Sequence, residues 1–388
     1  MKYNFDEIIN RENTNCVKWE AIGKVASDEK APVWVADMDF TCPLNVVKAL
    51  NERCSHPIYG YTIDPESTIS HITSWFKRRY NYVVADEACV LTTGVLQSLS
   101  AALRLFAKPG DEVLMAAPTY KPFKVKTELN DMVPVFTHMV WRNNRYELDF
   151  EDMEAKISDK TKVFILCNPQ NPTGRMFDKE EIEQIASFCE KHNLKIISDE
   201  IHIDFQFDGH HITPILNTNE YTKNNCISLV SIGKTFNMAG IKGSAAFVLN
   251  EELREAFKRE AEKSGISDLN MFAMVALDEC FTEESEEWLD QVLAYISENR
   301  NYVEKFLEEN LPECITYKPE GTYFYWLDLR NCGVDKDLIH EKLQEAGMYC
   351  NPGDFFGEDY VGFERVNLAC PRVYLEYAMK HLMEVFGK

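Results

Sequence analysis

The sequence predicts an α/β protein with a mainly parallel central sheet, together with a second, smaller α+β domain. Short apolar runs alternate with amphipathic segments between about residues 88 and 250, as in parallel strands joined by crossover helices. The chain of 388 residues is also long enough for two domains. The runs expected to form buried strands are 89–91, 112–116, 162–167, 194–198, 227–230 and 244–249.

Helical patterns lie between and after these runs. Asp178 is expected to cap a crossover helix, because two glutamates follow in the first turn and apolar residues recur on one face. Near Glu283 an acidic start leads into apolar residues at helical spacing as far as Leu311, which predicts a helix of about 25 residues. A strand at 321–329, a helix at 335–346 and a closing amphipathic helix are expected after it.

The expected domains follow from where these patterns change. We expect an N-terminal arm at 1–47, a large domain at 48–286 and a C-terminal small domain at 287–388. The arm has too little periodicity to fold alone, so it is expected to pack against the C-terminal part. The small domain would then form from both ends of the chain.

Charge and cysteine content argue against several classes of protein. The 41 basic and 63 acidic residues give a net charge of −22, which repels nucleic acid and anionic membranes. The twelve cysteines are scattered without a C-x-x-C pair, as is typical of reduced thiols in the cytoplasm. No apolar run approaches the ~20 residues of a membrane helix, and residues 1–20 lack the apolar stretch of a signal peptide. We therefore expect a cytoplasmic protein without a nucleic-acid or membrane partner.

Four polar motifs follow predicted strands, at the sheet edge where open α/β sheets bind ligands. They are T-T-G at 92–94, N-P-Q-N-P-T-G at 168–174, S-D-E at 198–200 and S-I-G-K-T-F-N at 231–237. Gly94 opens a predicted helix, whose free amides near Val95 and Leu96 would form an anion site suited to a phosphate.

Three of these motifs carry side chains suited to one cofactor chemistry. Lys234 follows an apolar strand, and a desolvated lysine can lose its proton near neutral pH and become a Schiff-base nucleophile. Asp199 closes the strand at 194–198, where a carboxylate could hold a protonated pyridine nitrogen. Asn171 supplies a short amide donor from a proline-bracketed turn. Each of these residues taken singly also fits a structural role, such as a surface ion pair.

In this order, with 28 residues from Asn171 to Asp199 and 35 from Asp199 to Lys234, the motifs resemble fold-type I pyridoxal-phosphate (PLP) enzymes, the aminotransferase class I/II superfamily. Finer motifs resemble its cystathionine β-lyase (C–S lyase, MalY/PatB-like) branch. They are V-A-D-M-D-F at 35–40, Y-G-Y-T at 59–62, K-T-F-N at 234–237 and N-L-A-C-P-R at 367–372. The likeness covers nearly the whole chain and implies that the large domain binds PLP.

The resemblance also implies a role for each of these residues. Lys234 binds the cofactor and then acts as the base, Asp199 pairs with the pyridine nitrogen, and Asn171 contacts the ring's phenolic oxygen and the substrate. The resemblance implies that the phosphate contacts Gly94, Val95, Leu96 and Ser231, and that the ring contacts Tyr120 and His202. It also implies that Tyr61 reaches the phosphate of the neighbouring subunit and that Arg372 binds the substrate α-carboxylate.

Two positions depart from the family pattern. His202 stands three residues after Asp199, where aminotransferases commonly carry a tyrosine, which leaves its contact with the phenolic oxygen open. Lys242 stands eight residues after Lys234, where many relatives carry a phosphate-binding arginine, and it is given no role.

The resemblance implies a homodimeric carbon–sulfur β-lyase acting on L-cystathionine or related cysteine S-conjugates, with thiol, pyruvate and ammonia as products. The alternative is a PLP-dependent aminotransferase, because the residues shared by the two classes do not separate them. A binding or regulatory role is a third possibility, although no appended DNA-binding segment supports it. No metal site is expected. His202 and Asp204 would lie on one face of an extended segment, whereas the adjacent His210 and His211 would point apart, so the four side chains are not expected to share an ion.

Overall fold

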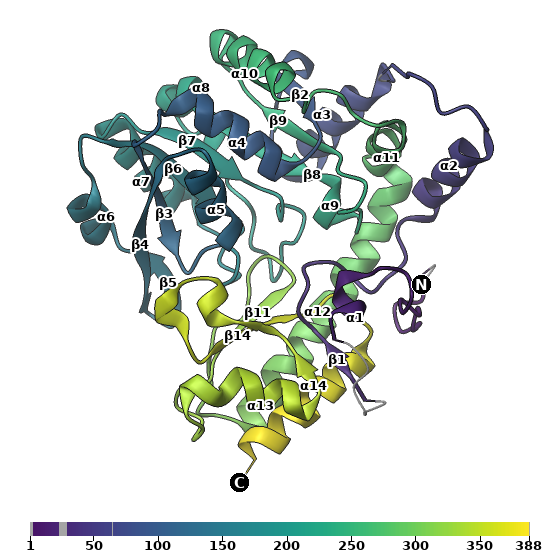
Figure 1. The fold of residues 1–388 in the computed structure, drawn as a ribbon, viewed down its shortest axis with the longest axis vertical. Helices are drawn as coiled ribbons and strands as arrows, with labels where there is room; N and C mark the ends of the chain where they lie inside the picture. The colour runs from purple at the N-terminus through teal and green to yellow at the C-terminus, as the bar shows by residue number, and fades with distance from the viewer. Residues whose placement is uncertain (1–2, 23–28, 64, 388) are drawn as a thin grey trace.

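A large mixed sheet forms the centre of the protein (Figure 1), in a computed structural model that describes residues 3–22, 29–63 and 65–387. Within these residues the sheet has eight strands in the order β2-β9-β8-β7-β6-β3-β4-β5. Strands β8, β7, β6, β3 and β4 run parallel to their neighbours in this series, while β9, β2 and β5 pair antiparallel. The strands are β2 (Cys89–Thr92), β3 (Glu112–Ala117), β4 (Val133–Arg142), β5 (Arg145–Leu148), β6 (Thr161–Cys167), β7 (Lys195–Asp199), β8 (Cys226–Ser231) and β9 (Ser244–Phe247).

The α/β class and all six expected strands are confirmed. Strands β4 and β5 were not expected, because β4 lies near the sheet edge and only some of its residues are buried, so it lacks a continuous apolar run. The helices of this part of the chain are α2 (Leu44–Ser55), α3 (Ser67–Tyr80), α4 (Val95–Phe106), α5 (Lys121–Leu129), α6 (Phe150–Lys156), α7 (Lys179–Lys191), α8 (Glu220–Asn225), α9 (Ile232–Thr235), α10 (Glu251–Lys263) and α11 (Met271–Cys280).

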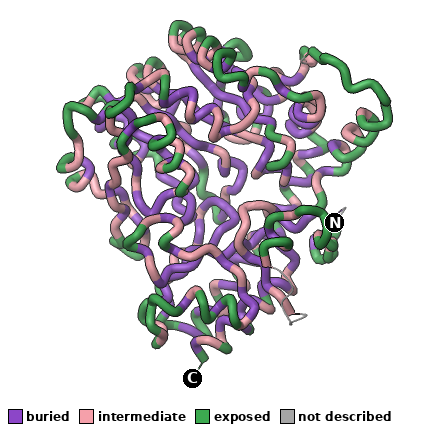
Figure 2. The backbone as a smooth tube through the Cα atoms, in the orientation of Figure 1, coloured by how far each residue is buried: buried purple, intermediate pink, exposed green. Residues whose placement is uncertain are grey.

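Alternation along the strands divides the apolar side chains between two cores, one on each face of the sheet. Val163 and Ile165 of β6 belong to the core that contains Leu99 of α4, whereas Phe164 belongs to the core that contains Ile182 of α7. The tube in Figure 2 is accordingly buried through the middle of the molecule. The predicted cap of α7 is present, since Asp178 and Glu181 form a reciprocal capping box.

A smaller sheet is built from the C-terminal part of the chain. Its strand order is β10-β11-β14-β13, and its pairs are antiparallel. The long helix α12 (Glu283–Asn310) leads into it and runs without interruption across the predicted boundary at 286. The remaining elements are β10 (Ile315–Thr316), β11 (Phe324–Asp328), α13 (Ile339–Ala346), β12 (Met348–Tyr349), β13 (Asn351–Pro352), β14 (Phe363–Asn367) and α14 (Arg372–Phe386).

The N-terminal arm packs on this small sheet region. Strand β1 (Ala31–Pro32) pairs in parallel with β12, and α1 (Val17–Glu20) precedes it. Asn367 of β14 also donates hydrogen bonds to the carbonyl oxygens of Val35 and Asp37, both of 2.7 Å. None of the described helices is long and apolar enough to span a membrane.

Candidate active site

A cavity of about 230 Å³ lies where several strands of the large sheet end, as the sequence predicts. It meets a second cavity of about 790 Å³ that opens toward the N-terminal arm and the small sheet. The two cavities share four residues: Ala36, Tyr120, Lys234 and Ala239. The lysine therefore stands at the junction of an inner and an outer chamber.

One end of the inner cavity is suited to an anion. Strand β2 leads through Gly94 into α4, so the first backbone amides of a twelve-residue helix lie at the cavity wall beside Val95 and Leu96. Ser231 lines the same cavity, and its hydroxyl caps α9 by accepting from the Gly233 amide at 3.0 Å. Lys242, which was given no role, also lines this cavity.

Lys234 lies on α9, directly after β8, and is half-buried. Its Nζ donates a 2.5 Å hydrogen bond to the carbonyl oxygen of Ala36 in the N-terminal arm. Loss of solvent lowers the pKa of this amine to about 8, and the positive charge of Arg365 contributes in the same direction. A lysine with this pKa has an appreciable neutral, nucleophilic fraction near neutral pH.

Asp199 ends β7, lines the same cavity as Lys234 and is 3% exposed. Its carboxylate accepts the Ile201 amide at 3.0 Å. Burial raises the pKa of Asp199 to about 6, against the hydrogen bond and the charge of Lys234, which lower it. A cationic ligand atom beside this buried carboxylate would stabilise its ionised form.

His202 is buried, lines the same cavity as Asp199 and makes T-shaped ring contacts with Tyr323 and Phe324. Its Nδ1 has no hydrogen-bond partner among the described residues. Burial lowers the pKa of His202 well below its ordinary value, so the ring is neutral. A buried polar atom without a partner at a cavity wall indicates a ligand contact.

Asn171 is buried beside the cavity, and its Oδ1 accepts a 3.0 Å hydrogen bond from Arg365. Arg365 lies on β14, and its Nη2 also donates to the carbonyl oxygen of Trp34 at 3.0 Å and to Asn351 at 2.6 Å. Its guanidinium carbon sits 3.9 Å from the centroid of the Phe324 ring.

Arg365 is a buried cation without an acidic partner. No described carboxylate lies within ion-pair distance of its guanidinium, and its Nε has no hydrogen-bond acceptor. Burial lowers the pKa of Arg365 to about 10. Since Arg365 lines the outer cavity together with Lys234, this charge is available to an anionic ligand.

The structure does not bring Arg372 to this site, in contrast to the sequence-based expectation. Arg372 begins α14, where its Nε donates to Asn299 at 2.8 Å and its guanidinium lies over the ring of Tyr302. Arg365, and not Arg372, lines the outer cavity with Lys234. Strand β14 explains the difference, because it carries Arg365 beside Asn171 while Arg372 follows the end of the strand and enters the helix.

Tyr120 and Tyr61 differ in position. Tyr120 forms part of the wall of both cavities, half-buried and edge-on to Phe123. Tyr61 is fully exposed in the segment between α2 and α3 and does not line either cavity of its own chain. A contribution from Tyr61 to a site therefore requires a second chain.

The mainly parallel sheet carries a lysine, an aspartate and an anion-binding helix start at one edge. This is the arrangement expected of a PLP-dependent enzyme. The family model for aminotransferase class I and II matches residues 35–382, and the chain belongs to this family. It is 34% identical over 382 residues to cystathionine β-lyase PatB of Bacillus subtilis, covering 98% of each chain.

Solved structures give the same placement. Cystalysin from Treponema denticola, which contains a pyridoxal 5'-phosphate cofactor, matches with a TM-score of 0.93 and 29% identity over 99% of this chain and 98% of that one. The PLP-bound C–S lyase from Staphylococcus hominis matches with a TM-score of 0.91 and 30% identity over 100% and 99% of the two chains.

Proposed function

We propose that this protein is a PLP-dependent carbon–sulfur β-lyase that cleaves L-cystathionine or related cysteine S-conjugates by α,β-elimination. The products are a thiol, which is homocysteine from cystathionine, together with pyruvate and ammonia. The likeness along the full chain to proteins named cystathionine β-lyase and C–S lyase supports this reaction over transamination. The single structural observation that carries the amino-acid substrate is the buried Arg365, unpaired with any described carboxylate, beside the low-pKa Lys234.

The residues of the inner cavity fit PLP. The α4 amides and Ser231 suit a phosphate, the buried Asp199 suits a protonated pyridine nitrogen, and the unpartnered His202 Nδ1 offers a polar contact to the ring. When bound, PLP supplies an electron sink for negative charge at the substrate α-carbon. Lys234 would hold the cofactor and Tyr120 would cover its ring.

The remaining groups act on the amino acid. Arg365 binds the α-carboxylate through its guanidinium, and Asn171 fixes the orientation of that guanidinium. The neutral amine of Lys234 takes the α-proton, and departure of the β-thiolate then breaks the carbon–sulfur bond. Hydrolysis of the remaining three-carbon fragment yields pyruvate and ammonia.

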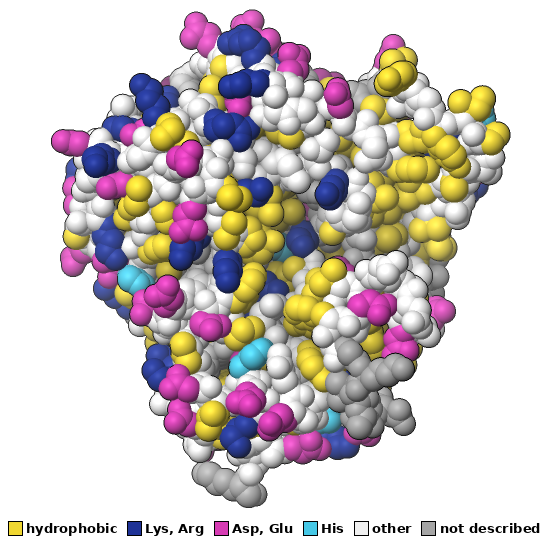
Figure 3. All heavy atoms as spheres, in the orientation of Figure 1, with side chains coloured by type: hydrophobic (Ala, Val, Ile, Leu, Met, Phe, Trp, Pro, Cys, Tyr) yellow, Lys and Arg dark blue, Asp and Glu magenta, His cyan; other side chains and the backbone are white. Residues whose placement is uncertain are grey.

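The protein would act as a homodimer in the cytoplasm. An exposed apolar area, seen at the upper right of Figure 3, lies over α2 and the segment that follows it. Its exposed residues are Leu44, Val47, Ile58, Tyr59, Tyr61 and Ile63. Such an area favours association with a second copy, which would bring Tyr61 to the neighbouring site. The scattered thiols are typical of a reducing compartment.

The test is product analysis on the PLP-loaded enzyme. Incubation with L-cystathionine and without any 2-oxo acid is expected to release thiol and pyruvate in equal amounts. Absence of pyruvate, together with amino-group transfer when a 2-oxo acid is added, would identify an aminotransferase instead. If the Arg365→Ala protein still binds PLP but no longer turns over cystathionine, its defect lies in substrate binding.

A further inference from the structure

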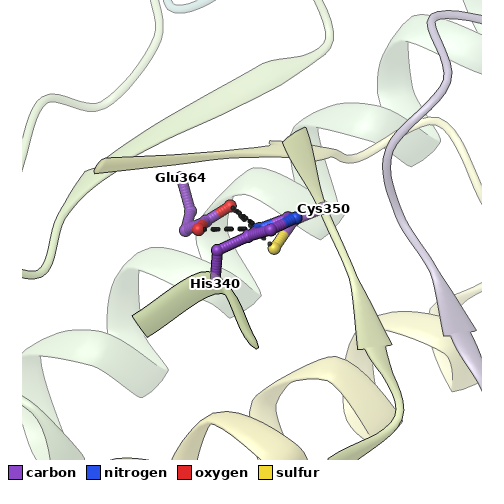
Figure 4. Close-up of side chains that lie close together, drawn as sticks. All are labelled: His340, Cys350 and Glu364. Carbon is purple, nitrogen blue, oxygen red and sulfur yellow. Dashed lines mark hydrogen bonds and ion pairs between the residues drawn. The ribbon is translucent and has the colours of Figure 1, made fainter. Parts of the chain in front are cut away.

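The side chains of a histidine, a cysteine and a glutamate, all three able to bind a metal ion, lie close together in the small sheet region, outside the PLP site (Figure 4). His340 comes from α13, Cys350 lies between β12 and β13, and Glu364 lies on β14. His340 Nδ1 is 3.0 and 3.2 Å from the two carboxylate oxygens of Glu364, and Cys350 Sγ is 3.1 Å from one of them. The three ligand atoms all lie within 4.8 Å of one another.

The burial of this cluster needs a compensating charge. Glu364 is 1% exposed and Cys350 is 3% exposed. Within the described residues, the side-chain oxygens of Glu364 receive hydrogen bonds from His340 and Cys350 alone. The carboxylate pairs with His340 at 3.0 Å, which compensates its charge when the imidazole is protonated. A divalent cation bound between the three side chains would supply the positive charge in place of that proton.

The geometry suits a tetrahedral ion. Zinc bonds of about 2.0–2.3 Å to nitrogen, oxygen and sulfur place neighbouring ligand atoms about 3.3–3.6 Å apart. The separations of 3.0–3.2 Å from Glu364 therefore need to widen by only a few tenths of an ångström, while Nδ1 and Sγ lie within 4.8 Å of each other. Histidine, thiolate and carboxylate together are a ligand set that zinc accepts and that magnesium and calcium do not prefer.

The surroundings supply support and access. Gln344, one helical turn after His340, has its amide nitrogen 2.9 Å from His340 Nε2. Rotation of that amide by half a turn would present its oxygen to an Nε2–H, the arrangement that holds a histidine coordinating through Nδ1. The His340 side chain is 30% exposed, so water can reach a fourth coordination position.

We propose that His340 Nδ1, Cys350 Sγ and a Glu364 oxygen form a zinc-binding site with water as the fourth ligand. On binding, Sγ donates a lone pair to the ion and its thiol proton passes to solvent, with no change of oxidation state. The sequence predicted no metal site because its cysteines are scattered and form no short ligand motif. The three ligands proposed here are 10 and 14 residues apart along the chain, so local spacing does not reveal them.

The position of the site suggests a structural role. Asn351 and Arg365 lie opposite each other on β13 and β14 and are joined by a 2.6 Å hydrogen bond. Cys350 comes directly before Asn351, and Glu364 comes directly before Arg365. Successive strand residues face opposite sides, so the ion would clamp β13 to β14 on one face while Arg365 serves the PLP site on the other. The ion would act as a positioning element and would not touch the reacting atoms.

The test measures zinc directly on the PLP-loaded full chain. After removal of metal with a chelator, titration with zinc chloride in a calorimeter is expected to show one ion per chain. Glu364→Gln and Cys350→Ser should each weaken this binding by about 100-fold or more. Cys332→Ser, a half-buried thiol outside the cluster, is the matched control and should bind zinc as the unmodified protein does.

Cobalt gives a second readout, since a thiolate ligand adds a charge-transfer band that Cys350→Ser should remove and Cys332→Ser should retain. His340→Ala changes a partly exposed helix position and provides the same comparison where a buried variant fails to fold. Failure of the unmodified chain to bind zinc, or equal binding by the unmodified chain and all folded cluster variants, would overturn the proposal.

Discussion

Arg365 donates a 3.0 Å hydrogen bond from Nη1 to Oδ1 of Asn171, across 194 positions of the sequence. The contact joins the small sheet to the turn after β6, and it aims a buried guanidinium at the cavity that Lys234 enters. Two further acceptors, on Trp34 and Asn351, fix the other end of the same group. The cation is thus held in place before any substrate arrives.

Arg365→Lys is expected to impair substrate binding and leave the cofactor in place. A lysine cannot reproduce the planar fork, and loss of charged hydrogen bonds worth about 2–3 kcal/mol lowers kcat/KM by about 30- to 150-fold. Steady-state kinetics with cystathionine measure the change. Arg372→Lys is the control, and a larger loss for Arg372→Lys than for Arg365→Lys would return the carboxylate-binding role to Arg372.

Lys234→Ala is expected to remove the visible absorption of lysine-bound PLP and to abolish turnover. The amine with the lowered pKa is the group that would bind the cofactor and move the α-proton. Absorption spectra of the purified protein provide the measurement. Lys242→Ala, which alters another lysine of the same cavity, should keep the band and show at most weaker PLP retention. A Lys234→Ala protein that retains the band would contradict the assignment.

Asp199→Asn is expected to stabilise the cofactor-free protein while weakening PLP binding. Because the pKa of Asp199 rises from 3.8 to about 6 on folding, the native state holds more protons between these values, and the free energy of unfolding falls as pH rises through the window. The cost at neutral pH is about 3 kcal/mol.

Urea unfolding of the cofactor-free protein at about pH 4 and about pH 7 tests this sign. The variant should exceed the unmodified protein in stability at the higher pH, and the difference should shrink at the lower pH. Asp131→Asn, an exposed carboxylate in a left-handed turn, serves as the control. Destabilisation by Asp199→Asn at neutral pH would show that the carboxylate is compensated without PLP.

Tyr61 is expected to complete the site of a second chain. Tyr61→Ala and Lys234→Ala proteins should each have little activity, whereas mixed dimers of the two should regain it, because one of their two sites has both native residues. Light scattering checks the dimeric state, and activity after co-expression checks the complementation. Leu129→Ala in place of Tyr61→Ala is the control, since Leu129 is exposed and lies outside the apolar area over α2. Lack of recovery in verified mixed dimers would place the function of Tyr61 elsewhere.

The sequence predicted the central strands well, because buried parallel strands are continuous apolar runs, and the residues at the strand ends follow directly from the chain. Asp199 and Lys234 were found in this way. Arg365 was not, since a charged residue inside a short strand of the small sheet has no periodic signal of its own. The adjacent charged residues Glu364 and Arg365, within the mostly apolar stretch 360–370, were the available clue.

The remaining differences involve contacts between distant segments. Strand β4, next to the edge strand β5, is recognised only once its pairing with β3 is known. The cluster of His340, Cys350 and Glu364 depends on how α13 packs against two strands, which local spacing does not encode. The exposure of Tyr61 likewise depends on how the segment between α2 and α3 packs.

The carbonyl oxygen of Val35 receives its hydrogen bond from Asn367, a residue that the ribosome adds 332 positions later. The segment that faces Lys234 through Ala36 is therefore made early and must wait for almost the entire chain before its partners exist. Folding from the N-terminus can build the large sheet during synthesis, but the substrate chamber can close only as the last strands are released. Premature termination shortly before β14 would accordingly yield a chain able to form the central sheet and unable to hold its amino-acid substrate.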